Sequence, residues 1–281
     1  MNELRKLQLV QTEILDVIVE ICSKNDINYY LIGGTLLGAV RHEGFIPWDD
    51  DLDIAMSRLD FEKFINLCAS ELNDKYYLHW ITTDNTYWLP FAKIRKKNTL
   101  LDEYTISHLN IPKEIFVDIF PLDNVIQEKS KTQKIKTNII KSISKIIYIK
   151  KKIKLNSISD KNMLINIIRI IAALFPIKFL FKIQIKFMKS ENHKSSAIYY
   201  INYGSNYDTI KQTILKSKYD PFKTAKFEEG IYKIPNDYDY ILTRIYGDYM
   251  KLPPEEERTL RHKPQKISFG SENLEVNHET L

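Results

Sequence analysis

A short acidic run has the residue types and the spacing to bind a metal ion. Acidic and apolar residues alternate across Asp49–Met56, as in a strand with one solvated face. Asp51 and Asp53 are two apart, so a strand would send both carboxylates to one face and Leu52 and Ile54 into the core. Two parallel carboxylates repel each other unless a cation lies between them, and Mg²⁺ or Mn²⁺ takes such oxygen ligands.

A third carboxylate strengthens this interpretation, because an isolated Asp-x-Asp is common and a solvated strand face explains most examples. Asp118 stands alone in the apolar run Ile115–Phe120, which is predicted to form a strand. A carboxylate there must be ion-paired or metal-bound to be tolerated. We favour a metal role over a structural salt bridge. Asp49 lies on the same predicted face as Asp51, nearer the loop.

A double glycine lies where phosphate could bind. Gly33 and Gly34 follow a strand predicted at Ile27–Ile32 and precede a short helix predicted at Thr35–Arg41. Backbone N–H groups at a helix N-terminus receive phosphate, although a double glycine is more often only a turn. Combined with acids on two strands, the order of these elements favours metal-assisted phosphoryl or nucleotidyl transfer.

Three residues between the glycines and the acids are further candidates. Arg41 and His42 end the predicted helix, where they either face a diphosphate or are surface charges. Trp48 immediately precedes the acids and either stacks on the base of a nucleotide substrate or packs in the core.

Cations later in the chain are candidate phosphate ligands. Lys93 lies among apolar residues in a strand predicted at Leu89–Arg95, and we expect it to contact phosphate. Arg95 shares its face and could substitute for it. Arg261 and His262 follow an acidic run and either return to the site or form a surface turn.

Composition limits the class of protein. The chain has 281 residues, a net charge of +5, and 17 Tyr, 13 Phe and 3 Trp, enough core material to exclude disorder throughout. Two cysteines do not make a disulfide framework, and no 18-residue stretch is apolar and uncharged. The N-terminal residues form an amphipathic pattern, not a signal peptide. We therefore expect a cytoplasmic globular protein.

The charge is unevenly distributed. Residues 127–200 hold 17 Lys plus Arg and 3 acids, a net charge of +14, so the rest of the chain carries −9. This Ile-rich segment, broken by Pro176, predicts several helices. They either lie in an anionic membrane interface or form a subdomain with a solvated basic face. No nucleic-acid-binding motif accompanies the charge, so nucleic acid is not an expected partner.

Periodicity predicts an α/β fold of the α+β kind. Helical spacing marks Leu4–Ile21 and Phe61–Leu72, and a further strand is predicted at Tyr76–Thr82. A helix at Asn236–Tyr246, with Asn236 as N-cap and Gly247 just past its end, is expected near the C-terminus. We divide the chain into a core at 1–125, a basic helical insertion at 126–200, a part completing the core at 201–262, and a frayed tail at 263–281.

Three blocks of sequence closely resemble the LicD family: Gly33–Asp53, Phe116–Asp123, and Tyr246–Met250 followed by Pro253-Pro254. The resemblance spans residues 30–262. It implies a nucleotidyltransferase-like mixed sheet with flanking helices, as in bacterial phosphocholine transferases and the related fukutin-type phosphotransferases. One departure is Phe227–Gly230, where the family more often has Phe-Glu-Gly, and this leaves the role of Glu228 open.

The resemblance implies roles for particular residues. Asp51 and Asp53 match the metal pair and Asp118 the third carboxylate, whereas Gly33 and Gly34, together with Thr35, match the phosphate-side loop. It also favours the functional role for Arg41 and His42. Either Asp53 or Asp118 is expected to double as the general base.

The activity implied is metal-dependent transfer of phosphocholine from CDP-choline to a hydroxyl of a cell-surface glycan such as teichoic acid, lipopolysaccharide or a capsule precursor. We expect the acceptor to be lipid-linked and the enzyme to be peripheral at the inner face of the membrane. Alternatives are transfer of glycerol or ribitol phosphate or of a nucleotidyl group, and a non-catalytic membrane-associated scaffold. A quaternary ammonium needs aromatic faces, and Trp80, Tyr87 and Trp88 are candidates.

Overall fold

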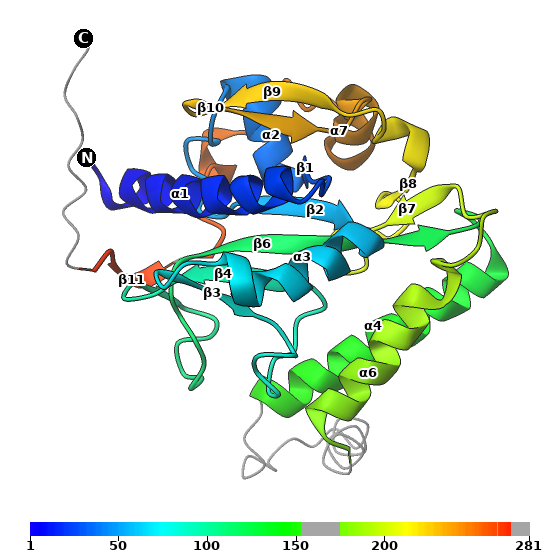
Figure 1. Cartoon of the computed structure of the whole chain (residues 1–281). Coiled ribbons are helices and arrows are strands. Elements are labelled where there is room, and N and C mark those ends of the chain that lie inside the picture. Colours follow the sequence, from blue (N-terminus) through cyan, green and yellow to red (C-terminus); the bar gives the residue numbers. More distant parts are fainter. Residues whose placement is uncertain (153–174, 263, 271–281) are drawn as a thin grey trace.

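A computed structural model describes residues 1–152, 175–262 and 264–270, and its centre is a mixed sheet (Figure 1). Seven strands form this sheet, with β1, β2, β6, β4 and β3 in that order and β7 and β8 continuing from β6. Only the β2–β6 pair is parallel among the pairings within it. The strands are β1 (Tyr30–Leu31), β2 (Asp53–Ser57), β3 (Tyr76–His79), β4 (Ala92–Lys96), β6 (Phe116–Val125), β7 (Tyr199–Ile201) and β8 (Thr213–Leu215). The expected mixed sheet with flanking helices is confirmed.

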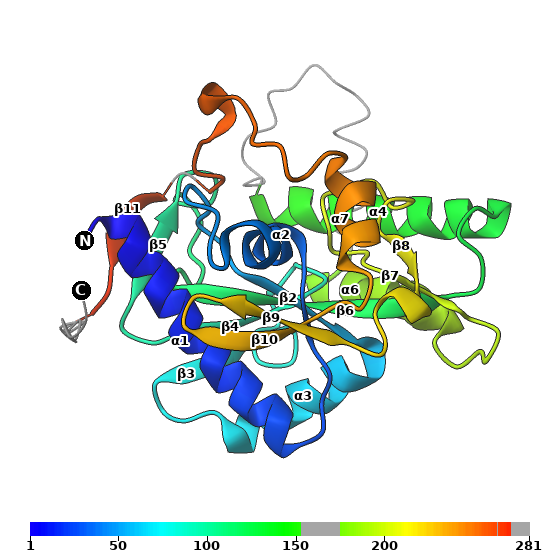
Figure 2. The same cartoon turned by 90° about the horizontal axis from the view of Figure 1, so that it is seen from above.

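Helices α1 (Glu3–Lys24) and α2 (Gly33–His42) lie on one side of the sheet, with the hairpin of β9 (Lys223–Phe227) and β10 (Gly230–Ile234) beside α2 (Figures 1 and 2). Burial of the apolar stripe of α1 explains this placement. Leu7, Ile14 and Ile18 are fully buried, and the Asn2 side chain caps the helix by accepting from the backbone N–H of Arg5.

Helix α3 (Arg58–Glu71) follows β2 directly and begins at the N-cap Ser57. Its buried residues Phe61, Phe64 and Cys68 confirm the predicted apolar stripe. Cys68 and Cys22 are both free, buried thiols, as expected from the sequence.

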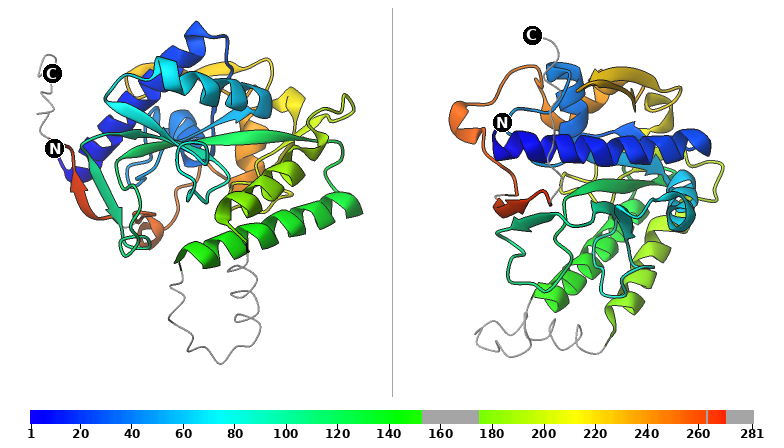
Figure 3. Two further views of the ribbon diagram at one scale, coloured as in Figure 1. Left: turned by 60° about the horizontal axis from the view of Figure 1, so that its bottom comes forward. Right: turned by 60° about the vertical axis from the view of Figure 1, so that its left-hand side comes forward.

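The basic segment forms helices where it is described. Helix α4 (Lys131–Lys152) and helix α6 (Ile177–Met188) pack together below the sheet, across from α1 and α2 (Figures 1 and 3). Residues 153–174 of the predicted insertion lie outside the described residues. Among the described residues, no helix combines the length and the apolar character needed to cross a bilayer. The proposed domain boundaries stay a prediction.

Several predicted elements are shorter than expected or shifted. The strand predicted at Asp49–Met56 begins only at Asp53, because the backbone carbonyls of Asp49 and Asp50 accept from α1 side chains and not from a neighbouring strand. The strand predicted at Ile27–Ile32 is reduced to β1. The strand predicted at Leu89–Arg95 starts at Ala92.

The C-terminal helix α7 (Tyr238–Tyr246) starts later than predicted. Asp237, not Asn236, is its N-cap, since the Asp237 carboxylate accepts from the backbone N–H of Tyr240. The helix ends at Gly247 as expected, with φ of 74°.

The prediction of a frayed tail from Lys263 onward is wrong for the first part of that segment. Residues Pro264–Ser268 form β11, which pairs antiparallel with β5 (Leu100–Glu103) in a second, two-stranded sheet. Polar composition does not prevent strand pairing, because backbone hydrogen bonds need no particular side chain, and Ile267 and Phe269 pack against the core. Figure 2 shows how the segment after α7 crosses the molecule to reach β11.

Candidate active site

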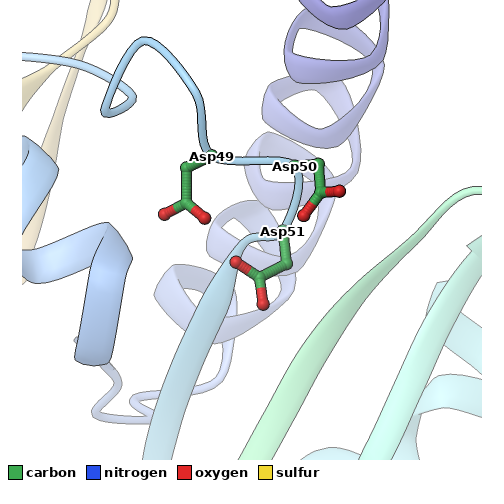
Figure 4. Close-up of side chains that lie close together, drawn as sticks. All are labelled: Asp49, Asp50 and Asp51. Atoms are coloured by element: carbon green, nitrogen blue, oxygen red, sulfur yellow. The ribbon is translucent and has the colours of Figure 1, made fainter. Parts of the chain in front are cut away.

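The acidic run forms a loop beside α1, immediately before β2. One oxygen from each of Asp49, Asp50 and Asp51 lies within 4.8 Å of the other two (Figure 4). Two glutamines of α1 hold this loop: Gln8 donates to the Asp49 carbonyl and Gln11 to the Asp50 carbonyl, both at 3.0 Å. The helix therefore sets where the carboxylates point.

The carboxylate of Asp50 is engaged by His262. It accepts from the backbone N–H of His262 at 3.0 Å, and the His262 ring nitrogen Nδ1 lies 3.0 Å from it. Asp50 is only 1% exposed. Its role is to dock the C-terminal segment on the acidic loop, a role that sequence reasoning missed because the partner is 212 positions away.

Asp53 and Asp118 occupy paired positions on the parallel strands β2 and β6. Burial raises the pKa of Asp53 well above its usual range, and the charges of Asp51, Asp118 and Asp49 raise it further. Burial and then Asp51 likewise raise the pKa of Asp49 to about 8. The carboxylates of Asp49, Asp51, Asp53 and Asp118 thus form one mutually repelling group, which we call the carboxylate cluster.

The carboxylate cluster fits a hard divalent cation. It offers only oxygen ligands, and the pKa values of Asp49 and Asp53 are raised first by burial and then by neighbouring carboxylates, a repulsion that bound positive charge would relieve. Asp50 is close enough to join but is engaged by His262. Asp49 is thus a candidate ligand beside the predicted Asp51, Asp53 and Asp118, and the metal role of all four stays a prediction.

Lys93 forms an ion pair within the site, and its predicted contact with phosphate stays a prediction. Its ammonium lies 2.6 Å from Asp118 Oδ1 and 3.3 Å from the centroid of the Phe116 ring. Burial lowers the pKa of Lys93 and the Asp118 charge opposes this. The salt bridge at Asp118, the alternative that we did not favour, is present in this structure.

Arg95 lies on the same face of β4 as Lys93, as predicted, and the two cations lie 5.1 and 3.3 Å from the centroid of the same Phe116 ring. The Nε of Arg95 donates to His79 Nδ1 at 2.9 Å and its Nη1 to the Glu114 carbonyl at 2.6 Å. The guanidinium of Arg95 therefore has its own partners in this structure, whereas Lys93 pairs with Asp118.

The two glycines bring the N-terminus of α2 against the carboxylates. A Cβ at Gly34 would lie 2.5 Å from Asp49 Oδ2, and one at Gly33, where φ is +57°, would lie 3.4 Å from Asp53 Oδ2. Thr35 has a structural task, because its hydroxyl accepts from the backbone N–H of Asp53 at 2.8 Å. Only glycine allows this approach of a helix N-terminus to the acids.

Arg41, His42 and Trp48 gather at the other end of α2. Arg41 donates to the Tyr249 carbonyl at 2.6 Å and to His42 Nε2 at 3.0 Å. The Arg258 guanidinium lies 5.4 Å from the Trp48 ring centroid. Arg41 therefore ties α2 to the loop after α7, and no described contact joins these three residues to the carboxylate cluster.

Arg261 is a cation beside the carboxylate cluster that makes no hydrogen bond to any described residue. Its guanidinium lies 6.0 Å from the Tyr207 ring centroid, and the Tyr207 hydroxyl donates to that of Tyr246 at 3.0 Å. Burial opposes its charge, but Asp51 and Asp53 raise its pKa. Arg261 keeps an exposed surface, its burial being partial, and its charged guanidinium can therefore bind an anion.

His262 adds a second positive charge. Burial alone would lower the pKa of His262, but the Asp50 hydrogen bond and the Asp51 charge raise it to about 9. The chain is held at His262 by Asp50 and, from Pro264 onward, by the β11–β5 pairing. Both residues do return to the site.

Glu228, in the segment Phe227–Gly230 that departs from the family's more frequent Phe-Glu-Gly, has a structural role. Glu228 accepts from the Phe45 backbone N–H at 3.0 Å and forms an ion pair with Arg5. It therefore fastens the β9–β10 turn to the loop that leads from α2 to the acids.

The three aromatic candidates for a choline site differ in how deeply they are buried. Trp80 is 6% exposed and Tyr87 is fully buried, so both belong to the core. Trp88 is half-buried, with the Lys151 ammonium 5.1 Å from its ring centroid.

Comparison with known proteins identifies the relationship. A family model described as LicD/FKTN/FKRP, nucleotidyltransferase domain, matches residues 26–154. The lipopolysaccharide cholinephosphotransferase LicD of Haemophilus influenzae is 30% identical over 278 residues, 92% of this chain and 96% of its own length. An uncharacterized protein of Rickettsia prowazekii is 37% identical over 79 residues, 21% of this chain and 30% of its own. Another, of Rickettsia typhi, is 58% identical over 41 residues, 15% and 13%. Similarity along almost the whole of both chains shows that this protein belongs to the LicD family.

Proposed function

We propose that this protein transfers phosphocholine from a CDP-linked donor, CDP-choline, to a hydroxyl of a lipid-linked cell-surface glycan. The observation that carries the proposal is the carboxylate cluster beside the glycine-led N-terminus of α2. The relative from Haemophilus influenzae is named as a lipopolysaccharide cholinephosphotransferase, which supports this choice of cargo and acceptor.

Asp49, Asp51, Asp53 and Asp118 would hold Mg²⁺ or Mn²⁺. The metal ion would neutralise the negative charge of the donor's diphosphate. Without positive charge at this position, the phosphates would meet four carboxylates, which explains why the chain also places Arg261 and His262 at the edge of the cluster.

The chain's own groups then bind and orient the diphosphate. Backbone N–H groups at Gly33 and Gly34 open α2 and favour negative charge at this end of the helix. Arg261 is free to form charge-assisted hydrogen bonds with the phosphate that leaves as CMP. Its guanidinium counters the charge that grows there as the bond breaks.

The transfer itself forms one P–O bond and breaks another. The acceptor hydroxyl oxygen attacks the phosphorus that bears choline, and the electron pair of the broken bond leaves with the CMP phosphate. The hydroxyl proton passes to Asp53 or Asp118. Lys93 donates to Asp118 at 2.6 Å and stabilises its charged form, which makes Asp118 the weaker base of the two.

Binding and turnover test this proposal together. The melting temperature is measured with Mg²⁺ and CDP-choline, CDP-glycerol, CDP-ribitol or CMP, and CMP release is followed with a glycan acceptor. We expect CDP-choline to stabilise the native state most, and Asp53→Asn to abolish release. Asp74→Asn, at an exposed Asp outside the site, is the matched control. A higher melting temperature only with another CDP-alcohol would indicate that its alcohol phosphate, and not phosphocholine, is transferred. An unchanged melting temperature with every compound would favour the non-catalytic scaffold.

A further inference from the structure

The outward face of α6 has an unusual composition for a solvated helix. Its buried residues lie on one side: Leu180, Phe181, Gln184 and Met188. Three exposed lysines, Lys178, Lys182 and Lys186, follow each other at intervals of four on the opposite side. None of the three forms an ion pair with a described residue, so their charges are not neutralised within the described part of the chain.

Two phenylalanines share this face. Phe179 is 47% exposed, and Phe175, just before the helix, is 40% exposed. Their rings stack with centroids 5.5 Å apart and an angle of 17° between the planes. The stacked pair of rings and the unpaired lysines thus share one exposed helix face.

An apolar groove opens beside this face. It has a volume of about 580 Å³ and lies between α3 and α6, with Phe61, Trp80 and Phe181 among its lining residues. Lys178 and Lys182 stand at its α6 side. A chain-like apolar group could therefore enter the groove while an anionic head group meets the lysines.

The neighbouring helix has the same sign of charge. Helices α4 and α6 together contain 11 lysines and no acidic residue. Lys134, Lys141 and Lys145 are exposed on α4. Such a surface attracts an anionic lipid layer at roughly 1 kcal/mol per lysine near the surface.

We propose that the face of α6 formed by Phe175, Lys178, Phe179, Lys182 and Lys186 binds the surface of an anionic lipid bilayer. Lysines and aromatic side chains on one helix face are typical of interfacial membrane binding. Nucleic acid fits less well, because Phe175 and Phe179 stack on each other and the adjacent groove is largely apolar. This inference is independent of the transferase activity and does not rest on it.

Vesicle sedimentation tests the proposal with the full-length protein. Binding is measured to vesicles of phosphatidylcholine alone and of phosphatidylcholine mixed with phosphatidylglycerol. The variant Lys178→Gln/Lys182→Gln/Lys186→Gln is compared with Lys223→Gln/Lys226→Gln/Lys251→Gln, which removes the same charge at exposed lysines elsewhere. We expect the first variant to bind mixed vesicles about 100-fold more weakly, and the control to bind like wild type.

Two further measurements separate the remaining outcomes. Phe179→Gln should weaken binding to mixed vesicles without changing net charge, and raised salt should weaken wild-type binding. Thermal unfolding of each variant checks that it is folded. Equal vesicle binding by both lysine variants would overturn the proposal. So would lysine-dependent binding to a DNA duplex with no binding to mixed vesicles.

Discussion

Asp53 and Asp118 face each other across the parallel pair β2–β6, at the start of β2. Burial raises the pKa of both carboxylates, and the charges of Asp51 and Asp118 raise that of Asp53 further, whereas the Lys93 ammonium opposes the rise at Asp118, so the charged form of Asp53 costs stability. We therefore expect this arrangement to serve the binding of positive charge, and not stability.

Asp53→Asn should separate function from stability. The native pKa of Asp53 lies above its unfolded value, so its charged form costs stability at neutral pH, and the amide should raise the melting temperature without metal. Turnover should fall by roughly 10² to 10³ or more. Thermal unfolding with and without Mg²⁺, together with CMP release, measures both effects. Unchanged turnover would remove Asp53 from the site.

Gly34→Ala should disrupt the approach of α2 to the acidic loop. Its new Cβ would lie 2.5 Å from Asp49 Oδ2, a clash that costs on the order of 1–3 kcal/mol. In an Asp49→Ala background the same substitution should cost much less, because the obstructing carboxylate is absent. Urea denaturation of the two single variants and the double variant gives the coupling energy. Simple additivity would show that Asp49 is not the obstacle.

Arg261→Gln should reduce kcat/KM for the CDP-linked donor by about 100-fold, since a guanidinium that serves the leaving phosphate is lost. Arg261→Lys should recover part of the loss, because it keeps the charge and loses the planar fork. Arg258→Gln is the matched control, as Arg258 bonds the Pro253 carbonyl and packs on Trp48. Equal losses at both positions would indicate a structural role for the whole segment.

Lys93→Met should destabilise the fold by about 3–5 kcal/mol, because it leaves the buried Asp118 carboxylate without its partner. Combining it with Asp118→Asn should restore much of that stability. Mg²⁺ should also stabilise Lys93→Met more than wild type if the ion binds Asp118. Equilibrium unfolding of Lys93→Met, Asp118→Asn and the double variant, with and without Mg²⁺, makes the comparison. If the double variant loses as much stability as Lys93→Met alone, the prediction is contradicted.

His79 should make stability sensitive to mild acid. Burial, reinforced by Arg95, lowers the pKa of His79 from 6.5 to about 4, so the unfolded chain takes up its proton first as pH falls. Its contribution is therefore complete above about pH 6.5 and declines towards pH 4, by about 3 kcal/mol in total. Urea midpoints across this range, for wild type and His79→Gln, test this. The variant should show the smaller decline, and parallel curves would refute the assignment.

Much of the architecture could be predicted from local sequence patterns. The apolar stripes of α1 and α3 follow from side-chain periodicity, and the glycine-led start of α2 and the acid Asp118 within Ile115–Phe120 are local sequence signals of the same kind, because each depends only on neighbours along the chain. The candidate acids Asp51, Asp53 and Asp118 could be chosen for the same reason, because an acid in an apolar run is locally anomalous.

The sequence by itself determined the residue types of the site, the helix and strand character of its supports and, through long matching blocks, the family. Tertiary structure decided which groups meet. It placed Lys93 on Asp118, gave Asp50 to His262, brought Arg261 to the cluster and turned the expected tail into β11. These contacts join residues separated by tens to hundreds of positions, and they depend on how the packed helices and sheets bring the chain back upon itself. No local spacing encodes that geometry.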